Sequence, residues 1–355
     1  MFYKSINMAF LVSMLYFMSL NLLLNGQDSE ASKVNSINLI KAGINLSADE
    51  AKQLEDRLEL DPNSMGLRAQ LLGYYFDKMD GSARKARVSH VLWFIRNAPG
   101  ESLSGLPYCW LNPILDGEVY YRAKNLWLHQ VQTYKDHPIV LGHAASFFSV
   151  YERNLAEDLL KRASDIDPNN TQWSLQLGYL YSLSLNDASV TTRREAAQKT
   201  LFHLEKLVDG RIEKTERASV VIMLARAAYE AGHLEKARNY AQELLSISQT
   251  HSSHGDAVHH GNLILGSLAL KLGSVEKAKG HLIAAGKTPG SNVLNSFGPR
   301  MSLAKELLEK GERDVVIEYL SLCAVFWKSG KAVLDNWLAT VKGGGVPSFE
   351  SRIGY

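Results

Sequence analysis

The longest apolar run of the chain lies at its N-terminus. Met8–Leu24 carries no charge and is hydrophobic apart from three small polar residues. Ser29 and Ala31 give the small-x-small pattern that a signal peptidase needs, so we predict residues 1–27 to be a signal peptide. The run is also about as long as a membrane span, roughly 17 to 20 residues, so an uncleaved N-terminal membrane anchor is the alternative. The expected protein is exported, periplasmic or secreted, or else anchored to a membrane by this segment alone.

The next segment has a different pattern. Residues 28–46 are polar and lack strong periodicity, which predicts a linker. At Ser47 a capping box with Glu50 predicts the start of a helix that ends at the breaker Asp61-Pro62-Asn63. The same breaker recurs at Asp167-Pro168-Asn169. Few stretches alternate with period two, so we expect an all-α fold over residues 47–341 and a flexible tail over residues 342–355.

Two helical segments repeat at one offset. Gly273 falls on Gly232, residues 276–278 fall on residues 235–237 with the same Glu-Lys-Ala sequence, and Leu265 falls on Leu224. In each copy a helix with a leucine and a small residue is followed by a glycine turn and a second helix rich in alanine. Such a recurrence is typical of repeat proteins, in which one two-helix unit stacks on the next.

These positions resemble the tetratricopeptide repeat, a helix-turn-helix of about 34 residues. The clearest copy consists of Leu265, Gly266, Ala269, Gly273, Ala278, Leu282, Ala285 and Pro289, and a second of Leu224, Ala225, Ala228, Gly232, Ala237, Ala241 and Leu244. Weaker copies extend the resemblance over roughly residues 50 to 330, and one departs from the family by a long insert after Tyr181. The resemblance implies an α-solenoid of stacked helix pairs that binds a protein or peptide.

One stretch does not fit the repeat. Residues 100–138 begin with a Gly- and Pro-broken loop around Trp110 and continue as a predicted helix from about Gly117 to Tyr134. It is either a degenerate repeat or a loop folded over a groove. Farther along, Pro299 is expected to start the last first-helix of the array.

The composition limits the chemistry. The formal net charge is only +2, too small to predict a nucleic-acid partner. Cys109 and Cys323 are far apart and form no disulfide framework or zinc motif, so we expect both to be buried small hydrophobic residues. No nucleophile elbow, phosphate-binding loop or zinc-protease motif is present in the sequence, and we expect no cofactor and no enzymatic activity.

The family resemblance also implies candidate binding residues. In tetratricopeptide proteins the first helices of successive repeats line a concave groove and contact the partner from defined helix positions. In this sequence those positions are Gln70, Tyr74, Gln172, Tyr179, Arg226, Tyr229, His260 and Lys305. Polar and aromatic residues of this kind suit peptide capture, although any solvated helix face carries similar residues.

A histidine cluster at residues 251–260 supports a rival function. His251, His254, Asp256 and His259 could together bind a metal and make the chain a metal-binding protein or a metal-dependent enzyme. Their spacing is irregular, whereas zinc-binding histidines on a helix usually stand four residues apart. The repeat register explains the stretch as a polar loop that leads into the helix of Leu265, with Asp256 placed to cap it. A membrane-tethered assembly factor is a third alternative.

Overall fold

The structure is a computed structural model that describes residues 30–76, 78, 80–186, 189–208, 214–250 and 255–349. The described residues contain nineteen α-helices, α2 to α20, three short 3-10 helices and no strand, which confirms the all-α prediction. Within them, no helix combines the length and the apolar character that crossing a membrane requires. The segment predicted as signal peptide or anchor lies outside the described residues, as do His251 and His254.

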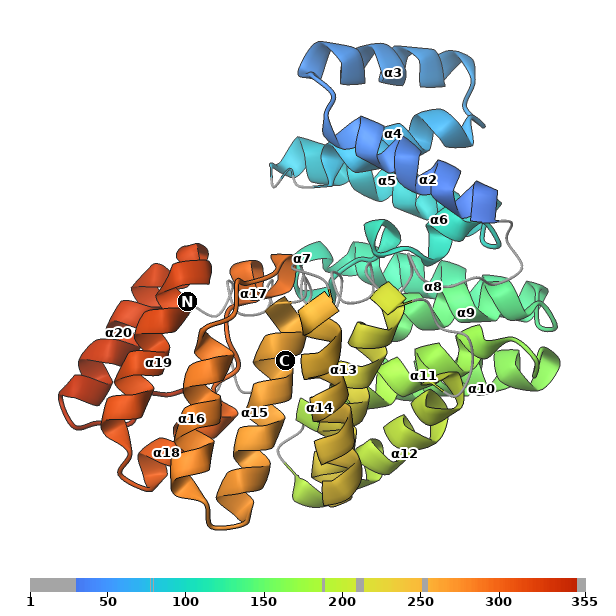
Figure 1. Ribbon diagram of the computed structural model, residues 1–355. Helices are drawn as coiled ribbons and strands as arrows, with labels where there is room; N and C mark the ends of the chain where they lie inside the picture. Colours follow the sequence, from blue (N-terminus) through green and yellow to red (C-terminus); the bar gives the residue numbers. More distant parts are fainter. Residues whose placement is uncertain are drawn as a thin grey trace. The chain divides into compact units, whose positions relative to one another are not determined.

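The chain divides into two compact units, with the boundary between Gln176 and Leu177. This boundary falls inside α11, which is labelled in Figure 1. The helices of the N-terminal unit are α2 (Glu30–Ile44), α3 (Ala48–Leu60), α4 (Met65–Tyr75), α5 (Gly81–Asn97), α6 (Ser102–Gly105), α7 (Pro113–Asp116), α8 (Glu118–Thr133), α9 (Pro138–Phe148) and α10 (Arg153–Ile166), followed by α11 (Thr171–Leu183). The capping box that predicts the start of α3 is confirmed, because Ser47 and Glu50 each accept a hydrogen bond from the other's backbone N–H.

Helix α2 shows that the predicted linker is wrong. Most of that segment is a helix that packs against α4. Ile40 is fully buried, and a Cβ atom on Gly43 would lie only 1.9 Å from the carbonyl oxygen of Gln70. A Cβ atom on Gly73 of α4 would likewise lie 2.2 Å from the carbonyl oxygen of Ile40. The two helices therefore pack backbone against backbone through glycines, a contact that leaves no apolar stripe in the sequence.

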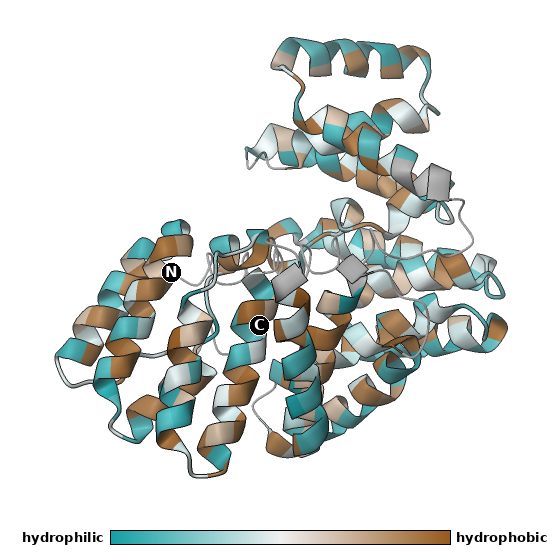
Figure 2. Cartoon of the chain, viewed as in Figure 1, coloured by the Kyte–Doolittle hydropathy of each residue, from teal (hydrophilic) through white to brown (hydrophobic). Residues whose placement is uncertain are grey.

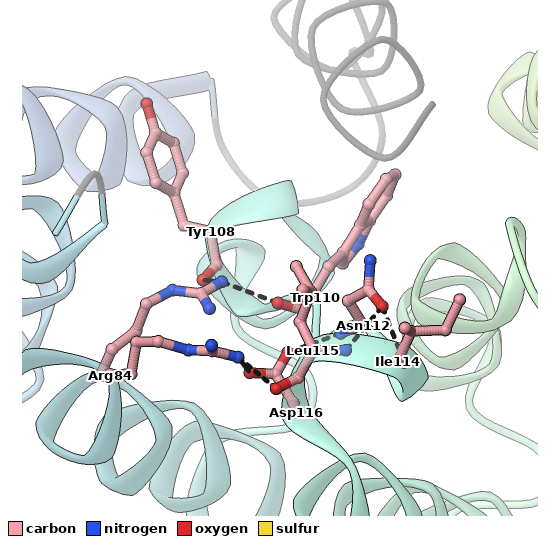
Figure 3. A network of polar contacts seen from close by, with 8 residues as sticks. Arg84, Tyr108, Trp110, Asn112, Ile114, Leu115 and Asp116 are labelled. Atoms are coloured by element: carbon pink, nitrogen blue, oxygen red, sulfur yellow. Dashed lines mark hydrogen bonds and ion pairs between the residues drawn. The ribbon is translucent and has the colours of Figure 1, made fainter. Parts of the chain in front are cut away.

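The stretch that does not fit the repeat is folded into the N-terminal unit. Asn112 caps α7 by accepting hydrogen bonds from the backbone N–H groups of Ile114 and Leu115. Asp116 accepts from the Asn112 backbone at 2.7 Å and from Arg84 of α5 at 2.7 Å (Figure 3). The predicted helix that follows is confirmed as α8.

A second arginine of α5 holds the loop before α7. Arg87 donates through Nη2 to the carbonyl oxygens of Tyr108, at 3.0 Å, and Trp110, at 2.7 Å. Cys109 and Trp110 are buried, so this loop is part of the core of the unit and not a cover over a surface. The prediction that both cysteines are buried is confirmed, since Cys323 is buried as well.

The C-terminal unit contains α12 (Val190–Val208), α13 (Lys214–Ala231), α14 (Leu234–Thr250), α15 (Gly255–Lys271), α16 (Val275–Gly286), α17 (Asn292–Phe297), α18 (Ser302–Glu309), α19 (Arg313–Phe326) and α20 (Lys331–Lys342). From α12 to α16 each helix packs against the next. Most of these helices carry brown and teal residues along the same helix (Figure 2), the pattern of elements that bury only part of their surface.

The predicted glycine turns recur with the same geometry. Gly232, Gly273 and Gly311 have φ angles of 84°, 79° and 87°, a left-handed conformation that favours glycine. In each turn the glycine N–H bonds to the carbonyl three residues earlier and the following N–H bonds to the carbonyl five residues earlier. This is the Schellman motif, repeated at the ends of α13, α15 and α18.

The small residues of the repeat pattern stand where helices approach closely. A Cβ atom on Gly266 would lie 2.3 Å from a methyl group of Leu303 in α18, and one on Gly178 would lie 2.3 Å from a methyl group of Leu204 in α12. The large positions are buried too, as Leu282 and Leu244 are fully inaccessible. The local packing that the repeat pattern predicts is therefore present.

Two predictions at the C-terminal end are wrong. Helix α18 starts at Ser302 and not at Pro299, because the preceding segment packs into the core, with Met301 fully buried. The tail is not free as far as it is described, since Phe349 is buried with its ring 5.1 Å from that of Trp337. Arg313 also donates to the Gly345 carbonyl oxygen, which fixes the segment after α20.

Candidate functional site

The predicted binding residues divide between the two units. Gln70, Tyr74 and Gln172 belong to the N-terminal unit, whereas Tyr179, Arg226, Tyr229, His260 and Lys305 belong to the C-terminal unit. In the C-terminal unit four of them stand on α13, α15 and α18, the first helices of three successive helix pairs. Helix α15 packs against both α13 and α18, so the structure brings the helices of these four residues together.

Tyr229 of α13 is the centre of a polar cluster across these three helices. A hydrogen bond joins its side chain to that of Ser267 in α15, and the ammonium group of Lys271 lies 5.5 Å from the centre of its ring. Burial, together with the charges of Glu306 and Glu230, raises the pKa of Tyr229 to about 12. We call Tyr229, Ser267, Lys271 and Glu306 the tyrosine cluster.

Glu306 of α18 supplies the carboxylate of this cluster. Burial raises its pKa, and the neighbouring carboxylates of Glu309 and Glu230 raise it further. The ammonium groups of Lys310 and Lys271 act in the opposite direction without cancelling the effect. Because burial is the largest cause, a further cationic group placed beside Glu306 would stabilise the ionised carboxylate.

Two of the predicted contact residues have mainly structural roles. Tyr179 is only 2% exposed, so it is a core residue and the prediction of a surface contact is wrong for it. Arg226 donates through Nη2 to the carbonyl oxygen of Leu185, at 2.8 Å, and to the Asn186 side chain, at 2.5 Å. It thereby holds the connection that follows α11, and little of its surface remains for a partner. Lys305, in contrast, is partly exposed on α18.

His259 joins three segments of the C-terminal unit. The ring is fully buried, and its Nδ1–H donates to the carbonyl oxygen of Ala285 in α16 at 3.1 Å. Its Nε2 accepts from the backbone N–H of Arg300 at 3.1 Å, and Tyr319 of α19 donates to the carbonyl oxygen of Arg300. Burial, and then the charge of Arg300, lower the pKa of His259 to about 4. Both ring nitrogens of the neutral imidazole are used, so His259 cannot bind a metal in this structure.

The structure also describes His260 and Asp256 of the histidine stretch. Burial lowers the pKa of His260, and the neighbouring His259, Arg300 and Arg226 lower it further. Asp256 lies inside the first turn of α15, where burial raises its pKa and Ser291 hydrogen-bonds to it. Among the described residues, no three histidine, cysteine or acidic side chains are grouped as metal ligands would be.

The predicted residues of the N-terminal unit lie in separate surroundings. Tyr74 packs edge-on against Tyr75 and under the ammonium group of Lys78, which is 4.1 Å from its ring centre. Gln172 stands in the first turn of α11, where its backbone N–H donates to Asn170. Gln70 faces a hollow of about 460 Å³ at the turn between α3 and α4.

A buried polar bridge in the N-terminal unit is absent from the predictions. His90 of α5 is 2% exposed, and its two ring nitrogens lie 3.4 Å from Glu55 of α3 and 3.3 Å from Arg68 of α4. Because arginine can only donate, Nδ1 accepts and Nε2–H points to the carboxylate. The bridge links three helices whose residues are up to 35 positions apart, and no local pattern in the sequence marks it.

Comparison with known proteins adds no relative: neither a family model nor a curated protein matches the chain.

Proposed function

We propose that the chain is a non-enzymatic α-solenoid scaffold of tetratricopeptide-like repeats that binds another protein or peptide through α13, α15 and α18. The observation that carries the proposal is the tyrosine cluster, because it is built from one side chain or more of each of these three helices. Three successive first helices thus contribute to a single patch. Such a patch is how stacked repeats form an extended binding surface.

The chemistry of the patch favours a peptide with a basic residue. Tyr229 offers a large, rigid ring with a hydroxyl group, the side-chain type that is enriched among residues dominating binding energy. The neighbouring Glu306, with its raised pKa, gains stabilisation when a lysine or arginine of the partner approaches it. Lys271 lies beside the ring and can pair with an acidic residue of the same segment.

The rival function, a metal centre at residues 251–260, has less support. His259 is committed to two backbone groups, and ligation of a metal would require breaking at least one of these hydrogen bonds. Elemental analysis of the purified chain, dialysed without chelator, tests the rival directly. Stoichiometric zinc or another transition metal would favour the metal centre over the scaffold.

A selection from a random displayed peptide library tests the proposed function. Peptides selected on the unmodified protein are measured against Tyr229→Ala and against the control Phe202→Ala. The control is closely matched, since Phe202 is an exposed ring of α12 with the ammonium group of Lys206 at 4.0 Å. Loss of a dominant aromatic contact is worth about 2 kcal/mol, so we expect Tyr229→Ala to weaken binding about 30-fold. Equal affinities for the two variants would contradict the proposal.

A further inference from the structure

The N-terminal unit contains two turns with the same sequence pattern. Asp61-Pro62-Asn63-Ser64 joins α3 to α4, and Asp167-Pro168-Asn169-Asn170 joins α10 to α11. In both, an aspartate ends one helix and a polar residue three positions later precedes the next. The two turns therefore serve as an internal comparison.

The second turn is closed by its own side chains. Asn170 donates through Nδ2 to the carboxylate of Asp167 at 3.0 Å, and its Oδ1 accepts from the backbone N–H of Gln172 at 3.0 Å. The side chain of Gln176, nine residues after the aspartate, is buried. The polar side-chain groups of this turn therefore form hydrogen bonds within the turn and with the start of α11.

The first turn is held differently. Arg68 of α4 donates to the carbonyl oxygen of Pro62 through Nε, at 3.2 Å, and through Nη2, at 2.7 Å, whereas the polar side chains around the turn are not used in this way. Ser64 makes no side-chain hydrogen bond to the start of α4, although it occupies the capping position. The side chains of Arg57, Asp61 and Gln70 make no hydrogen bond or ion pair with any residue that the structure describes. Four polar side chains around one turn therefore keep their hydrogen-bonding capacity.

These four side chains face a common hollow. Its volume is about 460 Å³, and it is lined by Arg57, Leu60, Asp61, Ser64, Gly66, Leu67 and Gln70. Gly66 stands where the closed turn has Gln172, and a Cβ atom on it would meet nothing within 4 Å. Leu60 is 88% exposed, and Met65, the first residue of α4, is 45% exposed. The absent side chain at Gly66 and the exposed side chain of Leu60 thus occur together with polar side chains that make no hydrogen bond.

We propose that this hollow binds a short extended peptide segment of a partner, which specifies a second contact site for the peptide binding proposed above and rests on that function. Ser64 and Gln70 can each donate and accept, as a peptide backbone with alternating N–H and C=O groups requires. Arg57 adds a donor and Asp61 an acceptor, and their charges cancel, so the segment is neutral. Leu60 and Leu67 contact an apolar side chain of the segment. The volume lies within the range of roughly 300 to 1,000 Å³ that is usual for ligand sites.

The test uses a capped neutral peptide, acetyl-Gly-Leu-Gly-amide, titrated into the isotopically labelled full chain. We expect saturable NMR shifts of the Gly66 backbone amide and of the Gln70 side-chain amide. The variant Gly66→Leu fills the hollow without a clash at Cβ, and leucine favours helix, so it should fold and reduce binding at least tenfold. The control Asn169→Leu adds the same side chain to the closed turn and should bind as the unmodified chain does.

Several results would overturn the inference. These are the absence of saturable shifts at Gly66 and Gln70, and unchanged binding by Gly66→Leu. Self-association that Gly66→Leu abolishes would assign the hollow to a second copy of the chain. If the capped peptide fails while library-selected peptides still respond to Tyr229→Ala, this inference fails and the proposed function stands. If the capped peptide binds, while library-selected peptides bind Tyr229→Ala as tightly as the unmodified chain, the hollow stands as a site and the proposed surface of α13, α15 and α18 fails.

Discussion

Replacing His259 with leucine tests whether this residue is structural. Leucine has a similar volume but no hydrogen-bonding group, so the carbonyl oxygen of Ala285 and the backbone N–H of Arg300 would be left buried without this partner. Each unsatisfied group costs about 1 to 3 kcal/mol. We therefore expect the free energy of unfolding at pH 7.5, measured by urea denaturation, to fall by about 2 to 5 kcal/mol.

The contribution of His259 to the free energy of unfolding should depend on pH, with a definite sign. Above pH 6.5 the imidazole of His259 is neutral in both the folded and the unfolded chain. Between pH 6.5 and about 4 the unfolded chain takes up the proton while the folded chain resists it, so stability is lost as the pH falls. At about 1.4 kcal/mol for each pH unit, the contribution of His259 decreases by about 3 kcal/mol over this window.

Comparing the two proteins across the window isolates this residue. Asp256 and Glu306, whose carboxyl pKa values are raised, change stability in the opposite direction but are present in both proteins. We expect the stability difference between the unmodified chain and His259→Leu to shrink from pH 7.5 to pH 4. A loss below 1 kcal/mol at pH 7.5, or a difference that does not change with pH, would show that His259 does not have this structural role.

Three further predictions concern packing, the buried loop and the binding surface. Gly266→Leu should destabilise the chain by about 1 to 3 kcal/mol in urea denaturation, because its Cβ atom meets α18. The control Gly280→Leu, whose Cβ atom meets nothing within 4 Å, should not have this effect, and equal stabilities of the two variants would contradict the packing. Burial raises the pKa of Cys109 to about 12, so this thiol should resist a thiol reagent in the native chain. Arg87→Met should release the loop before α7 and increase the labelling rate of Cys109 at least tenfold; an unchanged rate would show that Arg87 does not hold this loop. Glu306→Gln should weaken library-selected basic peptides about three- to tenfold in a direct titration, and the effect should decrease at high salt; an unaffected affinity would remove Glu306 from the site.

Several elements of the fold are predictable because their causes are local. The capping box of Ser47 and Glu50 and the glycine turns at Gly232 and Gly273 each depend on a few neighbouring residues. The close helix approach at Gly266 is also predictable, since a repeat pattern requires a small residue there. Local chemistry and a recurring spacing were enough to predict these features from the sequence.

Other elements depend on contacts that no local pattern marks. Helix α2 is polar for a packed helix because Gly43 and Gly73 bring its backbone against α4 without an apolar stripe. The roles of His259 depend on groups 26 and 41 residues away, so the histidine spacing alone left a metal site open. The tyrosine cluster joins side chains of three helices, and the repeat register predicted Tyr229 without its partners.

Hydrogen–deuterium exchange of the full chain, with and without a library-selected peptide, shows whether α13, α15 and α18 form the binding surface. We expect slower exchange in α13, α15 and α18 on peptide binding, with α12 and α14 unchanged as internal controls. Protection confined to other helices, with α13, α15 and α18 unaffected, would contradict it.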